Sequence, residues 1–433
     1  MEPPEHSSLN PPLPTHPSTT SFRLIRLYLI TGVFFLNLFG VELLEKSPTL
    51  QGYFLQGPLL ALTHTLVLGW ISMIIFGALF QFIPVVFEVP LYSEKLGYLQ
   101  YGFYVPGILG MIISFWTFNW MTPLLISTSF VWISILIFIY NMIRTLCMKP
   151  PRSLIHLFIL TGLFYLFLTA CLGYALAINF SFPYILHHSH VNLLKIHAHW
   201  GMVGWISMIL LGVTLKIVPM FTLSHGFSTR PSKWAYGFLN GGLIGLSLGW
   251  WFHSNPWFLK LGSVALTLGL LCFLWQVQQI YQKRLRRPWN TNTRLSWLGF
   301  SILGVIPIAG LSLQFFHLSS AWSASLVLTY AALLLLGFFT SFIIAQLYKI
   351  IPFLVWFHTF SHQVGLKPVP LMKDLFQESW GTRQFLSLAI SLPILVIGIL
   401  LNLALLREWG AAGFLISVIL LDWNLFQIFS WRA

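Results

Sequence analysis

Apolar residues occur along this chain in long stretches separated by short polar segments. Each stretch is roughly 18–27 residues long, the length that a helix needs to cross the hydrocarbon core of a bilayer. The pattern predicts an all-α polytopic membrane protein with about twelve transmembrane helices. The expected spans lie near residues 24–44, 58–87, 98–118, 122–144, 154–180, 195–221, 234–253, 257–281, 296–316, 322–351, 384–405 and 409–429.

The composition agrees with this pattern. Of 433 residues, 57% are hydrophobic and only 8% are charged, too few to cover the surface of a soluble protein of this length. The three cysteines are scattered through apolar stretches, so neither a disulfide framework nor a zinc site is expected. Residues 1–22 are rich in Pro, Ser and Thr, and we expect a disordered cytoplasmic tail before a transmembrane domain over 23–433.

The formal charge of +13 reflects membrane topology rather than affinity for nucleic acid. With the N-terminus inside, most Lys and Arg residues fall in inner segments, including the run over 283–287. The outer loops hold only Lys46, Lys195, Lys260 and Arg407. This asymmetry follows the positive-inside rule. We therefore expect a multi-pass protein of the bacterial cytoplasmic membrane, with both termini cytoplasmic, the lipid bilayer as its main partner and no nucleic-acid partner.

The second and sixth spans share a sequence repeat. Residues 64–84 and 199–219 both read His, then Gly-Trp-Ile-Ser-Met, Gly and Pro, at a constant offset of 135 residues. The tenth span keeps the Gly and the Pro, with Pro352 lying 133 residues after Pro219. Four helices per repeat predict three pseudo-repeats around a pseudo-threefold axis, with the second, sixth and tenth spans innermost and each ended by its proline. The repeats would cover about 23–150, 151–290 and 291–433.

A polar residue stands three positions before each of these prolines: Gln81, Lys216 or Lys349. We interpret these side chains as snorkelling toward the inner membrane interface. Proton uptake is the alternative interpretation.

Three histidines lie about one turn inside the outer ends of the second and sixth spans: His64, His197 and His199. Ionisable residues at that depth are costly and usually functional, so we expect cofactor binding rather than only hydrogen bonding. Residues two apart on a helix project about 200° apart, so His197 and His199 cannot share one small metal ion without unwinding the helix. They can serve two sites on opposite faces, and one would meet His64 across a heme plane.

The tenth span has Tyr330 and Ala332 where the sixth has His197 and His199, so cofactor binding should be asymmetric around the ring. Further candidate metal ligands lie in the outer loop before the sixth span and at the end of the seventh. For the loop, copper capture is the alternative to a simply solvated segment. These candidates are His187, His188, His190 and His253.

At these residues the chain resembles the heme-copper oxidase subunit I superfamily. Residues 197–205 read His-Ala-His-Trp-Gly-Met-Val-Gly-Trp, which is similar to the His-x-His heme helix of that family. The nearest likeness is to C-type cytochrome c oxidases and to heme- and copper-containing membrane proteins of the nitric oxide response. The resemblance implies that His64 and His199 ligate a low-spin heme b and that His197 faces a second heme or metal site.

The chain also departs from that family. Oxidases carry the His-x-His pair on the tenth helix and an adjacent His-His copper pair on the seventh, where only His253 lies nearby here. The usual oxygen-reducing binuclear center is therefore not expected. We expect an electron-transferring, cytochrome c oxidase subunit I-like heme protein of a respiratory complex, with other membrane or cytochrome subunits as partners. Whether it is an enzyme, as an oxidoreductase subunit, stays open.

Three alternatives remain at this point. One is a heme or copper sensing or assembly protein linked to nitric oxide or oxygen metabolism. Another is a membrane transporter, although the spans are poor in midplane charge and Asp422 is the main acidic candidate. The last is a cofactor-free scaffold.

Overall fold

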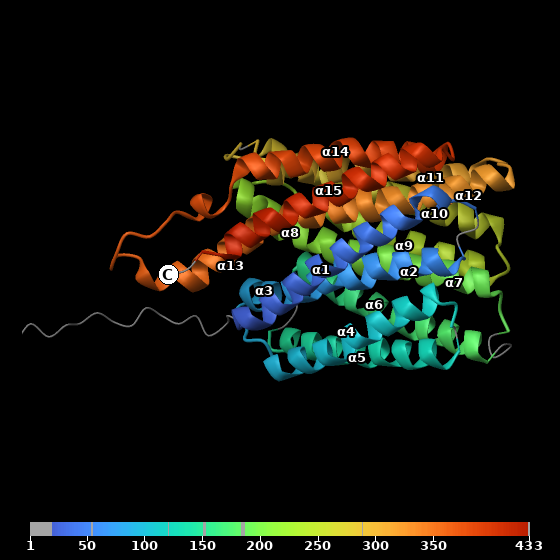
Figure 1. Ribbon diagram of the computed structural model, residues 1–433, viewed down its shortest axis with the longest axis horizontal. Coiled ribbons are helices and arrows are strands. Elements are labelled where there is room, and N and C mark those ends of the chain that lie inside the picture. The colour runs from blue at the N-terminus through green and yellow to red at the C-terminus, as the bar shows by residue number, and fades with distance from the viewer. Residues whose placement is uncertain are drawn as a thin grey trace, which may run out of the picture.

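A computed structural model describes residues 20–52, 55–119, 121–149, 153–182, 187–287 and 289–431. These residues fold into roughly parallel and antiparallel rods that form one elongated bundle (Figure 1). The α-helices are α1 (Phe22–Lys46), α2 (Gly57–His64), α3 (Met73–Phe87), α4 (Glu94–Trp116), α5 (Thr122–Leu146), α6 (Leu154–Ser181), α7 (His190–His199), α8 (Met208–Thr222), α9 (Arg230–Trp251), α10 (Pro256–Gln282), α11 (Thr291–Phe315), α12 (Ser320–Ala332), α13 (Ser341–Phe360), α14 (Glu378–Leu400) and α15 (Ala404–Phe429). Short 3₁₀ turns are η1 (Ser47–Thr49), η5 (Ser361–Gln363) and η6 (Met372–Leu375).

Eleven helical rods in the described part of the chain are long and apolar enough to cross a membrane, which agrees with an all-α polytopic membrane protein. The remaining long helix, α9, spans 22 residues but is rich in Gly, Asn and Ser. It packs along α10, where a Cβ on Gly242 would lie 2.7 Å from the backbone nitrogen of Leu266. Small residues therefore let these two helices approach closely, at the cost of apolar character in α9.

Three of the long rods change from α- to π-helix and back along their length. The π segments are η2 (Thr65–Ser72) between α2 and α3, η3 (Trp200–Ser207) between α7 and α8, and η4 (Leu333–Thr340) between α12 and α13. Each is eight residues long. Their starts are 135 and 133 residues apart, the same offsets as in the sequence repeat. π-Helical turns are rare and often mark functional sites.

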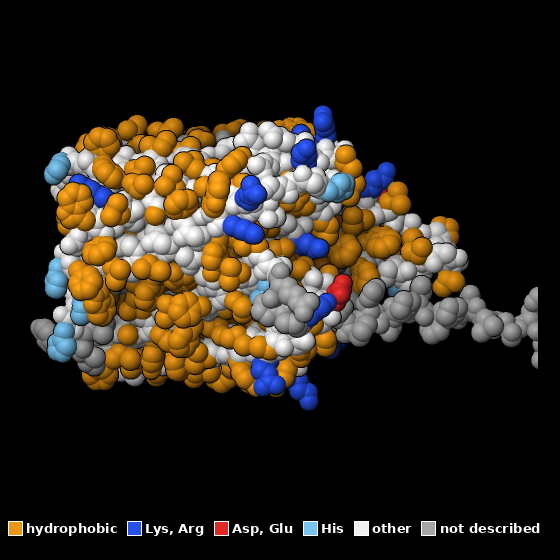
Figure 2. Space-filling model, turned by 180° about the vertical axis from the view of Figure 1, so that it is seen from behind, with side chains coloured by type: hydrophobic (Ala, Val, Ile, Leu, Met, Phe, Trp, Pro, Cys, Tyr) orange, Lys and Arg blue, Asp and Glu red, His pale blue; other side chains and the backbone are white. Residues whose placement is uncertain are grey.

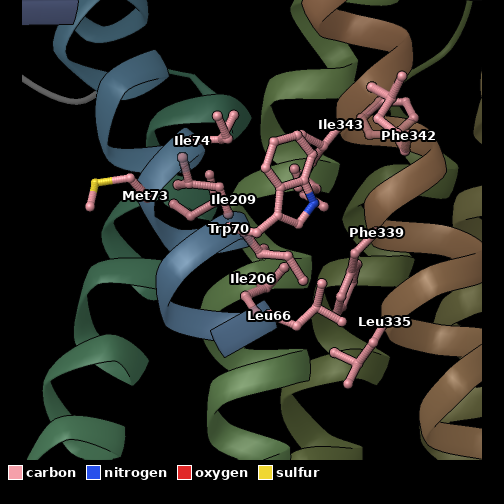
Figure 3. Packing of buried hydrophobic residues seen from close by; sticks show 14 of the residues in the cluster. Leu66, Trp70, Met73, Ile74, Ile206, Ile209, Leu335, Phe339, Phe342 and Ile343 are labelled. Atoms are coloured by element: carbon pink, nitrogen blue, oxygen red, sulfur yellow. The ribbon is translucent and has the colours of Figure 1, made fainter. Parts of the chain in front are cut away.

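The three π-containing rods meet in one hydrophobic cluster (Figure 3). Trp70 of η2 points toward the rods that contribute Ile206 of η3 and Phe339 of η4. The Trp205 indole Nε1 also donates to Ser72 Oγ at 3.1 Å, which joins η3 to η2. Buried hydrophobic contacts therefore hold these rods together at the center of the bundle.

The inner rods end differently from one another. α3 and α8 stop three residues after Pro84 and Pro219, and each is capped by a residue in the left-handed conformation, Glu88 (φ 55°) or Leu223 (φ 53°). The expectation that a proline ends each inner helix is wrong for the third rod, because α13 continues past Pro352 to Phe360. Its end and the connection to α14 project from the bundle (Figure 1).

Both described ends of the chain lie at the same end of the bundle (Figure 1). On the face in Figure 2, most Lys and Arg side chains gather toward this end, most His side chains gather at the opposite end, and apolar side chains cover the region between. We call these two ends the basic end and the histidine end.

The expected N-terminal tail lies outside the described residues up to position 19. Its last residues are packed, contrary to a disordered segment that reaches residue 22. Thr20 Oγ1 donates to the Phe80 carbonyl at 2.5 Å, and the Ser21 backbone nitrogen donates to Glu94 Oε1 at 2.7 Å. Thr20 and Ser21 are therefore hydrogen-bonded into the bundle just before α1, at the basic end.

Arg407 is buried, although the sequence suggested an outer loop. It lies in the first turn of α15 and is 1% exposed. Its guanidinium donates to the carbonyls of Ser47 and Pro48 at 2.8 and 2.6 Å and to Asn402 Oδ1 at 2.7 Å. These bonds satisfy the buried cation and tie α15 to the end of α1.

Candidate functional site: a histidine-lined cavity

A cavity of about 580 Å³ lies toward the histidine end of the bundle and is lined by His64, His197 and His199. Its walls are mostly apolar, with these imidazoles among a few polar groups. Cofactor sites in proteins are typically concave and apolar, with volumes of about 300–1,000 Å³ and a few placed polar groups. The cavity therefore has the size and character of a cofactor site.

Each of the three imidazoles is oriented by a backbone carbonyl. His64 Nδ1 lies 2.7 Å from the Leu60 oxygen, His199 Nδ1 lies 2.9 Å from the Lys195 oxygen, and His197 Nδ1 lies 3.0 Å from the Thr169 oxygen. A carbonyl only accepts hydrogen bonds, so these contacts favour the Nδ1–H tautomer in all three rings. Nε2 is then the nitrogen with a lone pair. Metal-ligating histidines are commonly held in this way.

His197 and His199 contact different helices, as their two-residue spacing predicts. His197 lies against α6, where a Cβ on Gly173 would come within 2.7 Å of its Cε1 atom. His199 lies beside α9, with its ring centroid 4.7 Å from that of Trp250. The two imidazoles therefore occupy different faces of the α7 rod.

His64 lies at the end of α2, and its ring centroid is 5.1 Å from that of Phe115 on α4. His64 and His197 line the same cavity. The charged neighbour of His199 is Lys195 of its own helix. His64 lies beside α4 and His197 beside α6, and both of these helices pack on α5, whereas His199 lies beside α9. The neighbouring helices therefore favour His197 as the partner of His64, whereas the family resemblance pairs it with His199.

The residues that line the cavity fall into two sets. One set comes from α2, α4, α5 and α6 and includes Phe115, Trp132 and Thr169, on the side of His64 and His197. The other comes from α9 to α12 and includes Trp250 and Tyr330, on the side of His199. The arrangement offers two binding regions. One lies beside α4 to α6 and holds His64 and His197, with His190 also in the wall against Phe180 of α6, and the other lies beside α9 and holds His199.

The candidate copper ligands are not gathered around one point. His187 is exposed, the ring of His188 lies 3.9 Å from that of Trp251, and His190 Nδ1 lies 3.2 Å from Asn179 Nδ2. His253 is exposed at the end of α9 with a φ of 55°. Across the residues that the structure describes, no three His, Cys, Asp or Glu side chains are placed to hold a metal ion.

Two residues that shape the site were missed in the sequence. Gly173 leaves room for the His197 ring, and the Thr169 carbonyl orients it. Both lie on α6, and no local pattern reveals which residue a neighbouring helix will meet. The hydrogen bonds of His64 and His199 join each ring to the carbonyl four residues earlier in its own helix. Such local bonds could have been predicted from the sequence.

No protein-family model and no curated protein matches this chain. A function can therefore be inferred from the cavity, from His64, His197 and His199, and from the carbonyl groups that orient these three rings.

Proposed function

We propose that this chain is a divergent heme-binding membrane protein of the heme-copper oxidase subunit I type, which transfers electrons within the membrane. One observation carries the proposal: of the four imidazoles that line one apolar cavity, those of His64, His197 and His199 each have Nδ1 at a backbone carbonyl and Nε2 left as a ligand. Neutral imidazole is a standard axial ligand of heme iron.

The donor set fits heme better than a bare metal ion. His64 and His197 come from different rods, line the same cavity and would hold a heme, of the b type by family analogy. When bound, heme supplies one-electron redox chemistry. The protein's part is to fix both imidazoles through the Leu60 and Thr169 carbonyls and to surround the group with apolar walls that limit water.

His199 supports a second and different site. Its imidazole faces the lining residues of α9 to α12, which include no histidine. α12 contributes Tyr330, the residue that corresponds to His197 in the repeat. A heme held there by one histidine would keep a coordination position for a gas such as carbon monoxide or nitric oxide. A scattered set of candidate copper ligands argues against the usual oxygen-reducing binuclear center.

The same proposal includes a ring of three four-helix units. The similar offsets of the π segments, 135 and 133 residues, support it, as does the meeting of their rods in one cluster (Figure 3). Lys and Arg side chains at the basic end favour cytoplasmic termini, which would set the cavity toward the outer side of a bacterial cytoplasmic membrane. Partner subunits of a respiratory complex would then supply and accept the electrons.

The test is an optical spectrum of purified protein that was expressed with ample heme. Spectra are recorded oxidised, reduced with dithionite, and reduced with carbon monoxide. We expect a sharp reduced α-band that carbon monoxide does not change, from the site of His64 and His197. A carbon monoxide shift in a second component would support a heme on His199. Absence of heme absorbance would overturn the proposal.

A further inference from the structure

A second cavity, of about 270 Å³, lies at the basic end of the bundle. It is enclosed by the ends of α8 and α10, the middle of α13, the beginnings of α11 and α14, and the connection that contains η6. Unlike the histidine-lined cavity, it has three cationic side chains in its wall: Arg286, Lys349 and Lys373.

The positive charge in this cavity is not balanced from within. Glu378 is the one carboxylate among the residues that line it. Its Oε1 atom already accepts from the backbone nitrogen and the hydroxyl of Thr291, at 2.6 and 2.8 Å. Among the described residues, none of the three cations lies within 4.0 Å of a carboxylate. Lys349 has both Arg286 and Glu378 as charged neighbours, but with three cations and one carboxylate the wall keeps a net positive charge that a bound anion would offset.

The surrounding backbone also favours an anion. α11 begins at Thr291 and α14 begins at Glu378, and residues of both first turns line or border the cavity. The N-terminus of a helix carries the positive end of its dipole. The α11 end is already partly satisfied, because the backbone nitrogens of Thr291 and Thr293 donate to Glu378 and Asn290, so the α14 end makes the main addition to the side-chain charge.

The size and the remaining walls limit what this anion is. The volume lies just below the range of about 300–1,000 Å³ that is usual for drug-sized ligands, so a single small head group fits better than a nucleotide. Phe221, Pro352 and Phe376 give the cavity an apolar side. Basic pockets between membrane helices at the cytoplasmic side are suited to anionic lipid head groups.

We propose that this cavity binds a phosphate group, carried by an anionic phospholipid or present as free phosphate. The proposal does not depend on heme binding. It gives Lys349 a role that its sequence counterpart Lys216 does not share. Both stand three residues before the inner-rod proline, but Lys216 is exposed and does not line this cavity, whereas Lys349 is half-buried in its wall.

The test uses the full-length protein, purified in detergent and freed of lipid. It is titrated separately with short-chain phosphatidylglycerol, short-chain phosphatidylcholine and inorganic phosphate at constant ionic strength, and binding is followed by native mass spectrometry. We expect saturable binding of phosphatidylglycerol or phosphate. Lys349→Gln and Lys373→Gln should each weaken it about fivefold, the usual contribution of one cation near an anionic head group. Lys216→Gln is the matched control and should leave it unchanged.

The arms separate the two sources of the phosphate. Binding of phosphatidylglycerol without inorganic phosphate identifies a lipid head group, and binding of inorganic phosphate identifies a soluble anion. Equal binding of phosphatidylcholine, an equal loss in Lys216→Gln, or no binding by the wild-type protein would overturn the proposal. Lys373 lies in the connection outside the long helices, so its variant stays informative if Lys349→Gln misfolds.

Discussion

The sixth and tenth rods, α7–η3–α8 and α12–η4–α13, have similar backbones and different side-chain chemistry. Each contains an eight-residue π segment at the repeat offset. Each also has a glycine, Gly204 or Gly337, where an added Cβ would collide with a side chain of the helix that opens the repeat. At the histidine end, however, the sixth rod has His197 and His199, and the tenth has Tyr330 and Ala332.

The two rods also differ at the basic end. α8 stops at Thr222 and turns through Leu223, whereas α13 continues to Phe360 and contributes Lys349 and Pro352 to the basic cavity. Both rods line both cavities, but the histidines come from the sixth rod and the buried lysine comes from the tenth. The two rods therefore share a backbone pattern, and each candidate site uses side chains in which the two rods differ.

The largest expected effect comes from removing an imidazole of the proposed heme pair. His64→Ala or His197→Ala should lower the low-spin α-band per protein more than about tenfold, because even loss of an outer-shell partner costs about 10–100-fold in metal affinity. His199→Ala should keep that band and lose any carbon monoxide-sensitive component. Reduced spectra with and without carbon monoxide measure both. Loss of the band in His199→Ala with retention in His197→Ala would restore the pairing that the family resemblance implies.

A smaller effect is expected from filling the space beside His197. In Gly173→Ala the new Cβ would lie 2.7 Å from Cε1 and 3.2 Å from Nδ1 of His197, so the ring must move away from the Thr169 carbonyl. We expect about tenfold weaker heme retention, the lower end of the range for a disturbed outer shell, measured as heme per protein after competition with apomyoglobin.

Gly310→Ala is the control for that substitution. Gly310 lines the same cavity, but its added Cβ would meet Tyr330 Cε2 at 3.7 Å, an ordinary contact. Equal heme loss in both variants would mean that the cavity as a whole is intolerant, and the specific role of Gly173 would be wrong.

Most of the long helices were predictable from the sequence, because a membrane helix needs a minimum length of apolar residues. Eleven helical rods in the described part of the chain meet this requirement. The repeat offset was predictable because Gly, Trp and Pro recur at fixed spacing. The π segments were not predictable, because each is a mainly apolar stretch of eight residues whose pattern is the same as that of a membrane α-helix. The partner of His64 was also not predictable, because it depends on how far each rod is rotated when its buried side chains pack.

We expect the same substitution, Gly to Ala, to destabilise the protein more in the sixth rod than in the tenth. Gly204→Ala would bring a Cβ within 2.6 Å of Tyr165 Cβ and against its ring, which cannot easily yield. Gly337→Ala would meet the Ile302 Cγ2 methyl at 2.7 Å, and a rotamer change can relieve that contact. Overpacking costs about 1–3 kcal/mol, and we expect Gly204→Ala near the top and Gly337→Ala near the bottom of this range. Unfolding in mild detergent measures both, and a larger loss in Gly337→Ala would contradict this account.

The smallest expected effect isolates one hydrogen bond between rods. The Trp205 indole donates to Ser72, whereas the Trp70 indole nitrogen, at the corresponding position of the first rod, has no partner among the described residues. Trp205→Phe loses the bond, and the tenth rod already carries Phe338 there. The Trp205→Phe substitution should destabilise the protein by about 1 kcal/mol more than Trp70→Phe, because Trp70→Phe removes only an unsatisfied donor. Both tryptophans are buried, so the loss of ring volume is similar and cancels in the difference between the two unfolding free energies. Equal losses would mean that the link from η3 to η2 contributes nothing and that apolar packing alone joins the inner rods.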